Sequence, residues 1–218
     1  MRPTVLSALV LAAALQAGLA AAATPEELTA FFRAVQLNDT KTVNDMVGKV
    51  VNANEINPLG GEPALVLAVR EDAMGVFRAL LDHPGTDLEA KAMNGNTALM
   101  MAAFKRNKAA AQALLERGAA VNRAGWTPLH YAAASGDEEI ARLLIARKAK
   151  LDAVSPRESG AYTPLMMAAR EGQEGVARLL LAQGANARLK NSEGLSAVQI
   201  AERAGRDDIV KAISGFKR

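Results

Sequence analysis

Residues 125–137, with the sequence GWTPLHYAAASGD, contain signals for both the beginning and the end of a short helix. Thr127 can cap a helix through its hydroxyl group, and Pro128 suits the first helical position, where a missing N–H does no harm. Gly136 can adopt the left-handed backbone conformation that ends such a helix, and Asp137 can cap the next one. The stretch therefore predicts a helix, a tight turn and the start of a second helix.

The predicted first helix has one face made of small apolar side chains. Leu129, Ala132 and Ala133 share this face, so a neighbouring helix can approach closely. The residues that follow, 138–146 (EEIARLLIA), place apolar side chains on one side at helical spacing. We therefore expect two short helices that pack through small residues.

The same unit recurs along the chain. Thr127 aligns with the residues that open five similar boxes: Thr29, Pro63, Thr97, Thr163 and Ser196. The steps between successive boxes are 34, 34, 30, 36 and 33 residues. A period near 33 residues with a threonine-proline-leucine-histidine box resembles the ankyrin repeat, and the resemblance runs from residue 26 to the C-terminus.

The resemblance implies an all-α ankyrin-repeat solenoid of about six helix-turn-helix units, joined by short β-turn fingers. Four of these units are well formed, whereas those at the two ends are degenerate. The predicted repeat domain covers residues 24–218, with units at approximately 26–60, 61–94, 95–124, 125–159, 160–193 and 194–218.

Residues 1–23 have the pattern of a secretory signal peptide. A short positive start is followed by an apolar run at 5–19 and by three alanines at 21–23, after which polar residues begin at Thr24. The alternative, a transmembrane anchor, requires about 20 apolar residues. We therefore expect export to the periplasm, with secretion as the alternative, and no membrane span after cleavage.

The composition argues against several classes of function. The formal net charge is +3, from 26 basic and 23 acidic residues, and no run of five like charges occurs, which makes nucleic acid a poor candidate partner. The chain has no cysteine, so it can form neither a disulfide nor a thiol nucleophile.

The remaining catalytic and metal-binding residue types are also sparse. His83 and His130 lie on separate repeats, a spacing that does not by itself make a metal site. The ring of His130 is expected to hydrogen-bond Thr127 and nearby backbone. The acidic pairs at 138–139 and 207–208 begin second helices, where negative charge favours the positive helix end. We therefore expect no enzyme activity, no cofactor and no metal.

Two details differ among the units. Arg106 stands where neighbouring units have Gly136 and Gly172, which disfavours the tight turn there. The finger at 121–126 is about three residues short, and the one at 152–162 is about three residues long. These changes either reshape the lip of a groove around the central repeat or are ordinary loop variation.

What remains is a binding surface. In ankyrin stacks the first helices and the finger tips line a concave face, which usually binds another protein. Methionine or tyrosine follows the box in three units, and such side chains adapt to partners, although a packing role is also open. Trp126 could instead pack on a neighbouring finger. The predicted partner-binding residues are Met101, Phe104, Lys105, Trp126, Tyr131, Tyr162, Met167 and Arg170.

The sequence thus predicts a monomeric, non-catalytic protein–protein interaction module or scaffold in the periplasm, with a partner protein on its concave face. Two alternatives stay open. One is an accessory or ligand-binding protein whose groove holds a peptide, glycan or small molecule. The other is an immunity protein that neutralises a periplasmic toxin.

Overall fold

The computed structural model describes residues 23–216, and within this range the chain forms twelve α-helices arranged as six consecutive pairs. The predicted signal peptide lies outside the described residues except for Ala23. The pairs are α1 (Pro25–Gln36) with α2 (Thr40–Met46), α3 (Ala64–Arg70) with α4 (Met74–Asp82), α5 (Ala98–Phe104) with α6 (Lys108–Glu116), α7 (Pro128–Ser135) with α8 (Glu138–Ala146), α9 (Pro164–Glu171) with α10 (Glu174–Gln183), and α11 (Ala197–Arg203) with α12 (Asp207–Ser214).

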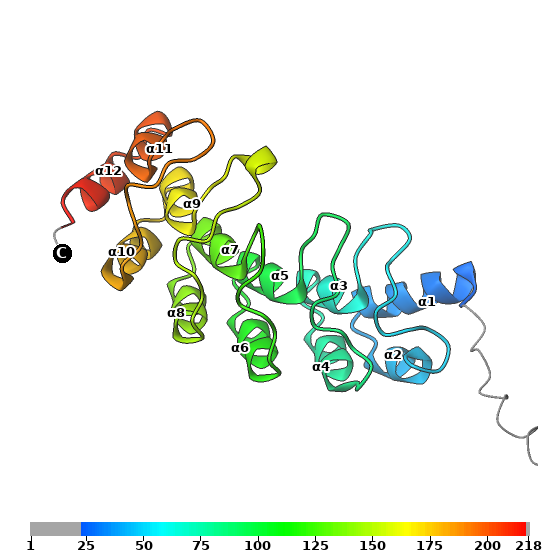
Figure 1. Cartoon of the computed structure of the whole chain (residues 1–218). Coiled ribbons are helices and arrows are strands. Elements are labelled where there is room, and N and C mark those ends of the chain that lie inside the picture. The colour runs from blue at the N-terminus through cyan, green and yellow to red at the C-terminus, as the bar shows by residue number, and fades with distance from the viewer. Residues whose placement is uncertain (1–22, 217–218) are drawn as a thin grey trace, which may run out of the picture.

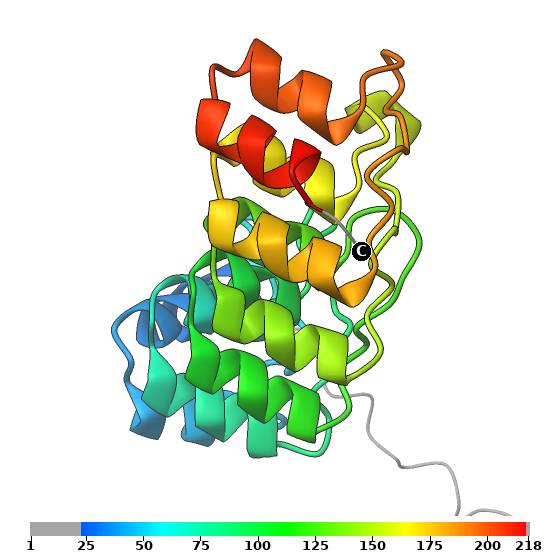
Figure 2. The ribbon, with the colours of Figure 1, turned by 90° about the vertical axis from the view of Figure 1, so that its left-hand side faces the viewer.

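The pairs stack side by side into a curved solenoid of two helical rows. Figure 1 shows the first helices of the pairs in an inner row and the second helices in an outer row. Figure 2 shows the outer row from the side, as a stack of nearly parallel helices. The prediction of an all-α solenoid of about six helix-turn-helix units is therefore confirmed.

One turn position has the same backbone conformation in every pair. The residue between the two helices has a positive φ at six sites: Asn38, Asp72, Arg106, Gly136, Gly172 and Gly205. The sequence disfavoured this turn at Arg106, and that expectation was wrong, because Arg106 adopts the left-handed conformation with φ of 58°. Asn107 stabilises the turn, since its backbone N–H donates to Ala102 and its side chain caps α6 by accepting from the Ala110 N–H at 2.9 Å.

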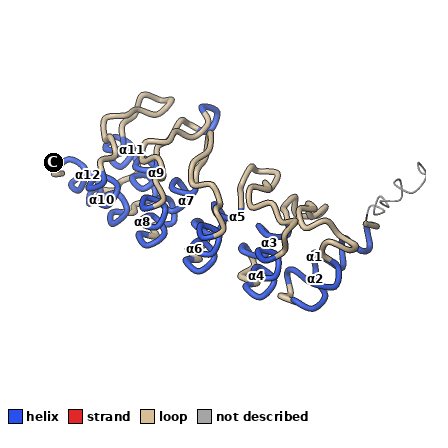
Figure 3. The backbone as a smooth tube through the Cα atoms, turned by 60° about the horizontal axis from the view of Figure 1, so that its bottom comes forward, coloured by secondary structure: helices blue, strands red, loops and turns tan. Residues whose placement is uncertain are grey.

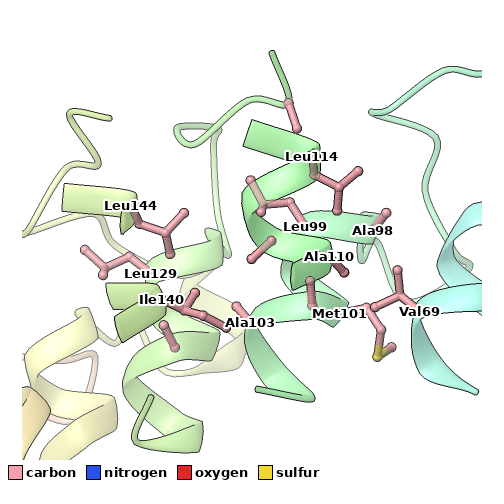
Figure 4. Packing of buried hydrophobic residues seen from close by; sticks show 14 of the residues in the cluster. Val69, Ala98, Leu99, Met101, Ala103, Ala110, Leu114, Leu129, Ile140 and Leu144 are labelled. Atoms are coloured by element: carbon pink, nitrogen blue, oxygen red, sulfur yellow. The ribbon is translucent and has the colours of Figure 1, made fainter. Parts of the chain in front are cut away.

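The hydrophobic core lies between neighbouring pairs (Figure 4). Leu99 and Leu114 come from the α5/α6 pair, and Leu129, Ile140 and Leu144 come from the α7/α8 pair. All five side chains are almost completely buried. Each pair therefore covers its apolar surface with the next pair, as expected for a stack of repeats.

The fingers all extend from the side of the first helices, and Figure 3 shows these connections gathered along one edge of the solenoid. The long finger contains a short 3-10 helix, η1 (Arg157–Ser159). Pro156 lies so close to Gly125, in the short finger, that a Cβ at Gly125 would be 3.2 Å from the proline ring. The long finger also bonds the next one, because the Ser192 N–H donates to the Gly160 carbonyl at 3.0 Å. The extra residues of one finger thus cover the shortened finger before it.

His130 joins the central pair to the long finger. Its Nδ1 accepts the Thr127 backbone N–H at 3.2 Å and lies 2.8 Å from the Thr127 hydroxyl. With Nδ1 as acceptor, the ring proton is on Nε2, which donates to the Tyr162 carbonyl at 2.9 Å. The expected bond from His130 to Thr127 is therefore present. Thr127 and His130 form a capping box at the start of α7, and the Thr127 hydroxyl also contacts the His130 ring.

Ala133 tests the packing of this stack. It is fully buried in α7, which contacts both α5 and α9, so Ala133→Leu forces a larger side chain into a close helix contact. We expect the free energy of unfolding to fall by about 1–3 kcal/mol. Chemical denaturation measures this change, with Ala109→Leu on the exposed side of α6 as the control, expected within about 0.5 kcal/mol of the parent. Equal midpoints for both variants would contradict the packing described here.

His130 makes stability depend on pH. Burial lowers its pKa from 6.5 to about 4, outweighing its bonds to backbone carbonyls. Above pH 6.5 the ring is neutral in both the folded and the unfolded chain. Between pH 6.5 and about 4 the unfolded chain binds a proton that the folded chain does not, so stability falls as the pH falls, by about 3 kcal/mol in total.

Urea denaturation at a series of pH values measures this loss. His130→Gln cannot titrate, so it is expected to be less stable at neutral pH but to lose less on going from pH 6.5 to 4. A parent and a variant with parallel pH profiles would rule out His130 as the titrating group.

Candidate functional site

Three aromatic side chains meet on the inner, concave side of the solenoid. The rings of Phe104 and Tyr131 have centroids 6.2 Å apart and are perpendicular, and Trp126 lies 6.2 Å from Tyr131 in a tilted arrangement. Trp126 also meets the buried ring of His130 edge-on at 5.2 Å. Edge-to-face and tilted contacts at these distances are favourable for aromatic rings, so the side chains pack into one aromatic cluster.

The rings of this cluster border a half-open pocket of about 330 Å³ on the concave face. We call it the central pocket. Its lining comes from three successive first helices and one finger, and consists of Phe104, Trp126, His130, Tyr131, Ala134, Met167, Arg170 and Glu171.

Tyr131 is held in place from the preceding finger. Its hydroxyl donates to the Asn96 side-chain oxygen at 2.5 Å, so the phenol ring crosses from α7 towards the neighbouring unit. Burial raises the pKa of Tyr131, and this group is therefore a neutral hydrogen-bonding phenol at physiological pH. Tyr131 therefore contributes an aromatic ring to the site and does not act as a general base.

Tyr162 and two charged residues form the other side of the site. The Arg170 guanidinium lies over the Tyr162 ring at 5.0 Å from its centroid, which is a cation–π contact. The Arg170 Nε donates to Glu171 at 2.8 Å, so the two opposite charges are paired. The Tyr162 backbone is fixed by Ser155, whose hydroxyl accepts the Tyr162 N–H at 2.9 Å.

The structure groups five of the eight predicted partner-binding residues around the central pocket: Phe104, Trp126, Tyr131, Met167 and Arg170. Tyr162 lies beside them through its contact with Arg170. Phe104 is 54% exposed, a large fraction for a phenylalanine, and Trp126 and Tyr131 are half-buried.

Two predicted residues lie elsewhere. Met101 is only 8% exposed and belongs to the core cluster with Val69, so it packs between repeats (Figure 4). Lys105 is exposed at the C-terminal end of α5, where it borders a separate depression with Asp72 and Arg106. The residues that align with them in the next units, Tyr131, Met167 and Glu171, do line the central pocket, so position within the repeat does not by itself decide which side chains reach it.

Three lining residues were not among the predicted partner-binding residues. His130 was assigned a structural role, which it has, but one edge of its ring also borders the pocket. Ala134 and Glu171 occupy the ends of α7 and α9. The signal that could have found them is repeat register, since Ala134 aligns with Phe104 and Arg170, and Glu171 aligns with Lys105.

The chemistry of the site favours binding. Residues 23–216 bring no three metal-ligating side chains together in a way that could hold an ion. Within the same range no helix combines the length and the apolar character needed to cross a membrane. The central pocket itself offers aromatic faces, one neutral histidine edge and one paired carboxylate.

The chain is similar to known proteins through its repeats. A family model described as "Ankyrin repeats (3 copies)" matches residues 31–124, 84–155 and 152–216. The chain is 33% identical over 115 residues to the transient receptor potential cation channel subfamily A member 1 of Homo sapiens, which is 51% of this chain and 10% of that protein.

Two further relatives show the same partial similarity. The chain is 31% identical over 133 residues to the neurogenic locus notch homolog protein 1 of Homo sapiens, which is 60% of this chain and 5% of that protein. It is 41% identical over 76 residues to the fem-1 homolog A-like protein of Mus musculus, which is 34% of this chain and 12% of that protein. The chain thus spans between 5% and 12% of the length of these relatives, and the similarity concerns the repeats alone. Since the matched segments run from residue 31 to residue 216 without a gap, this chain belongs to the ankyrin repeat family.

Proposed function

We propose that this protein is a non-catalytic interaction module of the periplasm that binds a partner protein on its concave face, around the central pocket. The observation that carries the proposal is the cluster of Phe104, Trp126 and Tyr131, whose rings remain partly exposed on that face. Aromatic residues are enriched at the centres of protein interfaces and provide much of their binding energy.

Family membership supports the same function. Ankyrin repeats are protein–protein interaction modules and are generally non-catalytic. The long finger with η1 lies next to the shortened finger on the same edge of the groove (Figure 3), beside the aromatic cluster, so this edge is uneven there. The groove is therefore asymmetric at the place where the aromatic rings gather, which favours recognition of one particular partner over non-selective binding.

The volume of the central pocket bears on the ligand-binding alternative. At about 330 Å³ it is at the lower end of the range for small-molecule sites, about 300–1,000 Å³. A pocket of this size on an extended groove can also hold one side chain of a larger partner. We therefore place a peptide, glycan or small molecule second, and regard toxin neutralisation as one form of the protein-binding function.

The N-terminus of α1 would accommodate the removal of residues 1–23. Thr24 is the N-cap of α1, with its backbone nitrogen 2.8 Å from the Glu27 carboxylate and its hydroxyl accepting the Glu27 N–H at 3.2 Å. Cleavage after Ala23 would convert that nitrogen into an amino group that is already placed beside a carboxylate.

Processing is tested by the intact mass of the protein recovered from a periplasmic fraction. We expect a chain that begins at Thr24, because three alanines precede it. Cleavage one residue earlier is the nearest variation. A periplasmic protein that still begins at Met1 would contradict the proposal of a cleaved signal peptide.

Partner binding is tested with the double substitution Trp126→Ala and Tyr131→Ala. Loss of two central aromatic side chains is expected to weaken partner capture by about tenfold or more. The mature protein is used to capture partners from periplasmic extract, which mass spectrometry identifies, and the affinity of both forms is then measured by titration.

The matched control is Arg142→Ala on α8, in the outer row, where the side chain forms only an exposed pair with Glu138. It is expected to bind as the parent does. Circular dichroism first establishes that the double variant is folded, since Trp126 also contacts His130. A folded double variant with unchanged affinity would show that the partner binds elsewhere.

A further inference from the structure

A pair of residues recurs in the repeats at the inner edge of the groove. The first member is the finger residue just before the box, and the second, eight positions later, lies at the end of the first helix. The pairs are Glu62 with Arg70, Asn96 with Phe104, Trp126 with Ala134, Tyr162 with Arg170, and Leu195 with Arg203.

In three units an arginine occupies the second position, and in two of them it covers the first residue, whereas Arg203 pairs with Glu193. Arg70 forms an ion pair with the buried Glu62 at 3.0 Å. Arg170 lies over the Tyr162 ring at 5.0 Å from its centroid. The fold therefore places a guanidinium group on this finger residue by two different interactions, one ionic and one with an aromatic face.

The central unit has the aromatic residue but lacks the arginine. Trp126 takes the place of Tyr162, while the second position is Ala134, whose single methyl group is too short to cover the indole. The central pocket lies at this position, and its lining includes Phe104 and Arg170, the residues that align with Ala134 in the two neighbouring units. The pocket is thus the space that an arginine side chain fills in the next unit.

The chemistry of the lining suits a cation. Among aromatic side chains, tryptophan attracts a positive charge most strongly, and the pocket is lined by Trp126. Phe104 and Tyr131 provide two further rings. The Glu171 carboxylate borders the pocket, and after accepting one bond from Arg170 it has lone pairs for further donors.

Two positive side chains lie near the pocket, and each has a contact of its own. The charge of Arg170 is balanced by Glu171, and Arg123, which acts on the Tyr131 hydroxyl, has its guanidinium 4.0 Å from the sulfur of the buried Met100. Burial keeps His130 neutral at pH 7, with a pKa of about 4, so the edge that borders the pocket carries no charge.

We propose that the central pocket binds an arginine side chain of the partner protein, with its guanidinium over Trp126 and hydrogen-bonded to Glu171. A guanidinium is planar and weakly hydrated, so it stacks on aromatic faces more readily than a lysine ammonium does, and Arg170 already shows this arrangement on Tyr162. The inference rests on the proposed concave-face function and specifies the chemistry of its central contact.

Trp126 is the only tryptophan of the chain, so its fluorescence reports directly on the pocket. The mature protein is titrated with N-acetyl-arginine amide, and with the citrulline, leucine and glutamate analogues as matched probes. We expect a saturable change with the arginine probe and binding at least about fivefold weaker for neutral citrulline, which has nearly the same shape. Equal binding of arginine and citrulline, or stronger binding of the leucine or glutamate probe, would overturn the proposal.

Variants then locate the bound probe. Ala134→Arg supplies the missing side chain from within the repeat, so it is expected to abolish binding of the arginine probe. Glu171→Gln is expected to weaken binding by about threefold or more, since the glutamine oxygen still accepts a hydrogen bond but carries no negative charge. Glu139→Gln, which removes an exposed carboxylate on α8 outside the pocket, is expected to bind as the parent does.

An Ala134→Arg variant that binds the probe as well as the parent would show that the probe occupies another site.

The result of the arginine-probe titration can be distinguished from the result of the partner-capture experiment. If partner capture depends on Trp126 and Tyr131 but the arginine probe does not bind, the proposed binding of a partner on the concave face stands, and the proposal that the pocket holds an arginine side chain is wrong. If capture is unaffected by those substitutions, the concave-face function is wrong whatever the probe does.

Discussion

Every helix pair in this chain must bury its apolar surface against its neighbours, because a unit of about 33 residues has too little volume for a core of its own. This constraint explains the alanines at the contact faces, such as Ala132 and Ala133, which let adjacent first helices approach closely. It also explains the first unit. There Phe31 and Phe32, edge-to-face at 5.2 Å, bring large rings to the end of the stack that no other helix pair precedes within the described residues.

The same constraint limits where the repeats can vary. The steps of 30 and 36 residues on either side of the central unit together equal two steps of 33, so the change in finger lengths leaves the helices in register. Pro156 covers Gly125 in the shortened finger, and His130 bonds the Tyr162 carbonyl at the base of the long one. The helices therefore keep their packing, and only the fingers at the edge of the groove differ in length. The aromatic side chains lie beside these fingers.

Most of the fold could be predicted from the sequence, because the box, the small-residue face and the turn are local signals that repeat. Arg106 shows the limit of such signals. Glycine at a turn position indicates a left-handed backbone conformation, because glycine adopts it without strain. At Arg106 the same conformation is stabilised by the hydrogen bonds and the helix cap that Asn107 supplies. Met101 shows a second limit, because the residue after the box is buried at Leu67, Met101, Met167 and Ile200 and half-buried only at Tyr131, a difference that residue type alone did not indicate.

The central pocket could be predicted only in part for the same reason. The aromatic rings could be singled out in the sequence, because aromatic residues are rare in this chain. The cavity could not, because it depends on the short side chain of Ala134, which stands out only when it is compared with Phe104 and Arg170 at the same position of the adjacent units. In a repeat protein a binding site can thus be created by removing a side chain as well as by adding one. The neighbouring repeats keep the helices in place, so a single small residue leaves a space between them. The larger side chains at the same position of the adjacent units define the shape and the chemistry of that space. Such a site costs the stack little stability, since Ala134 lies at the edge of the groove and not in the packed face that carries Ala132 and Ala133.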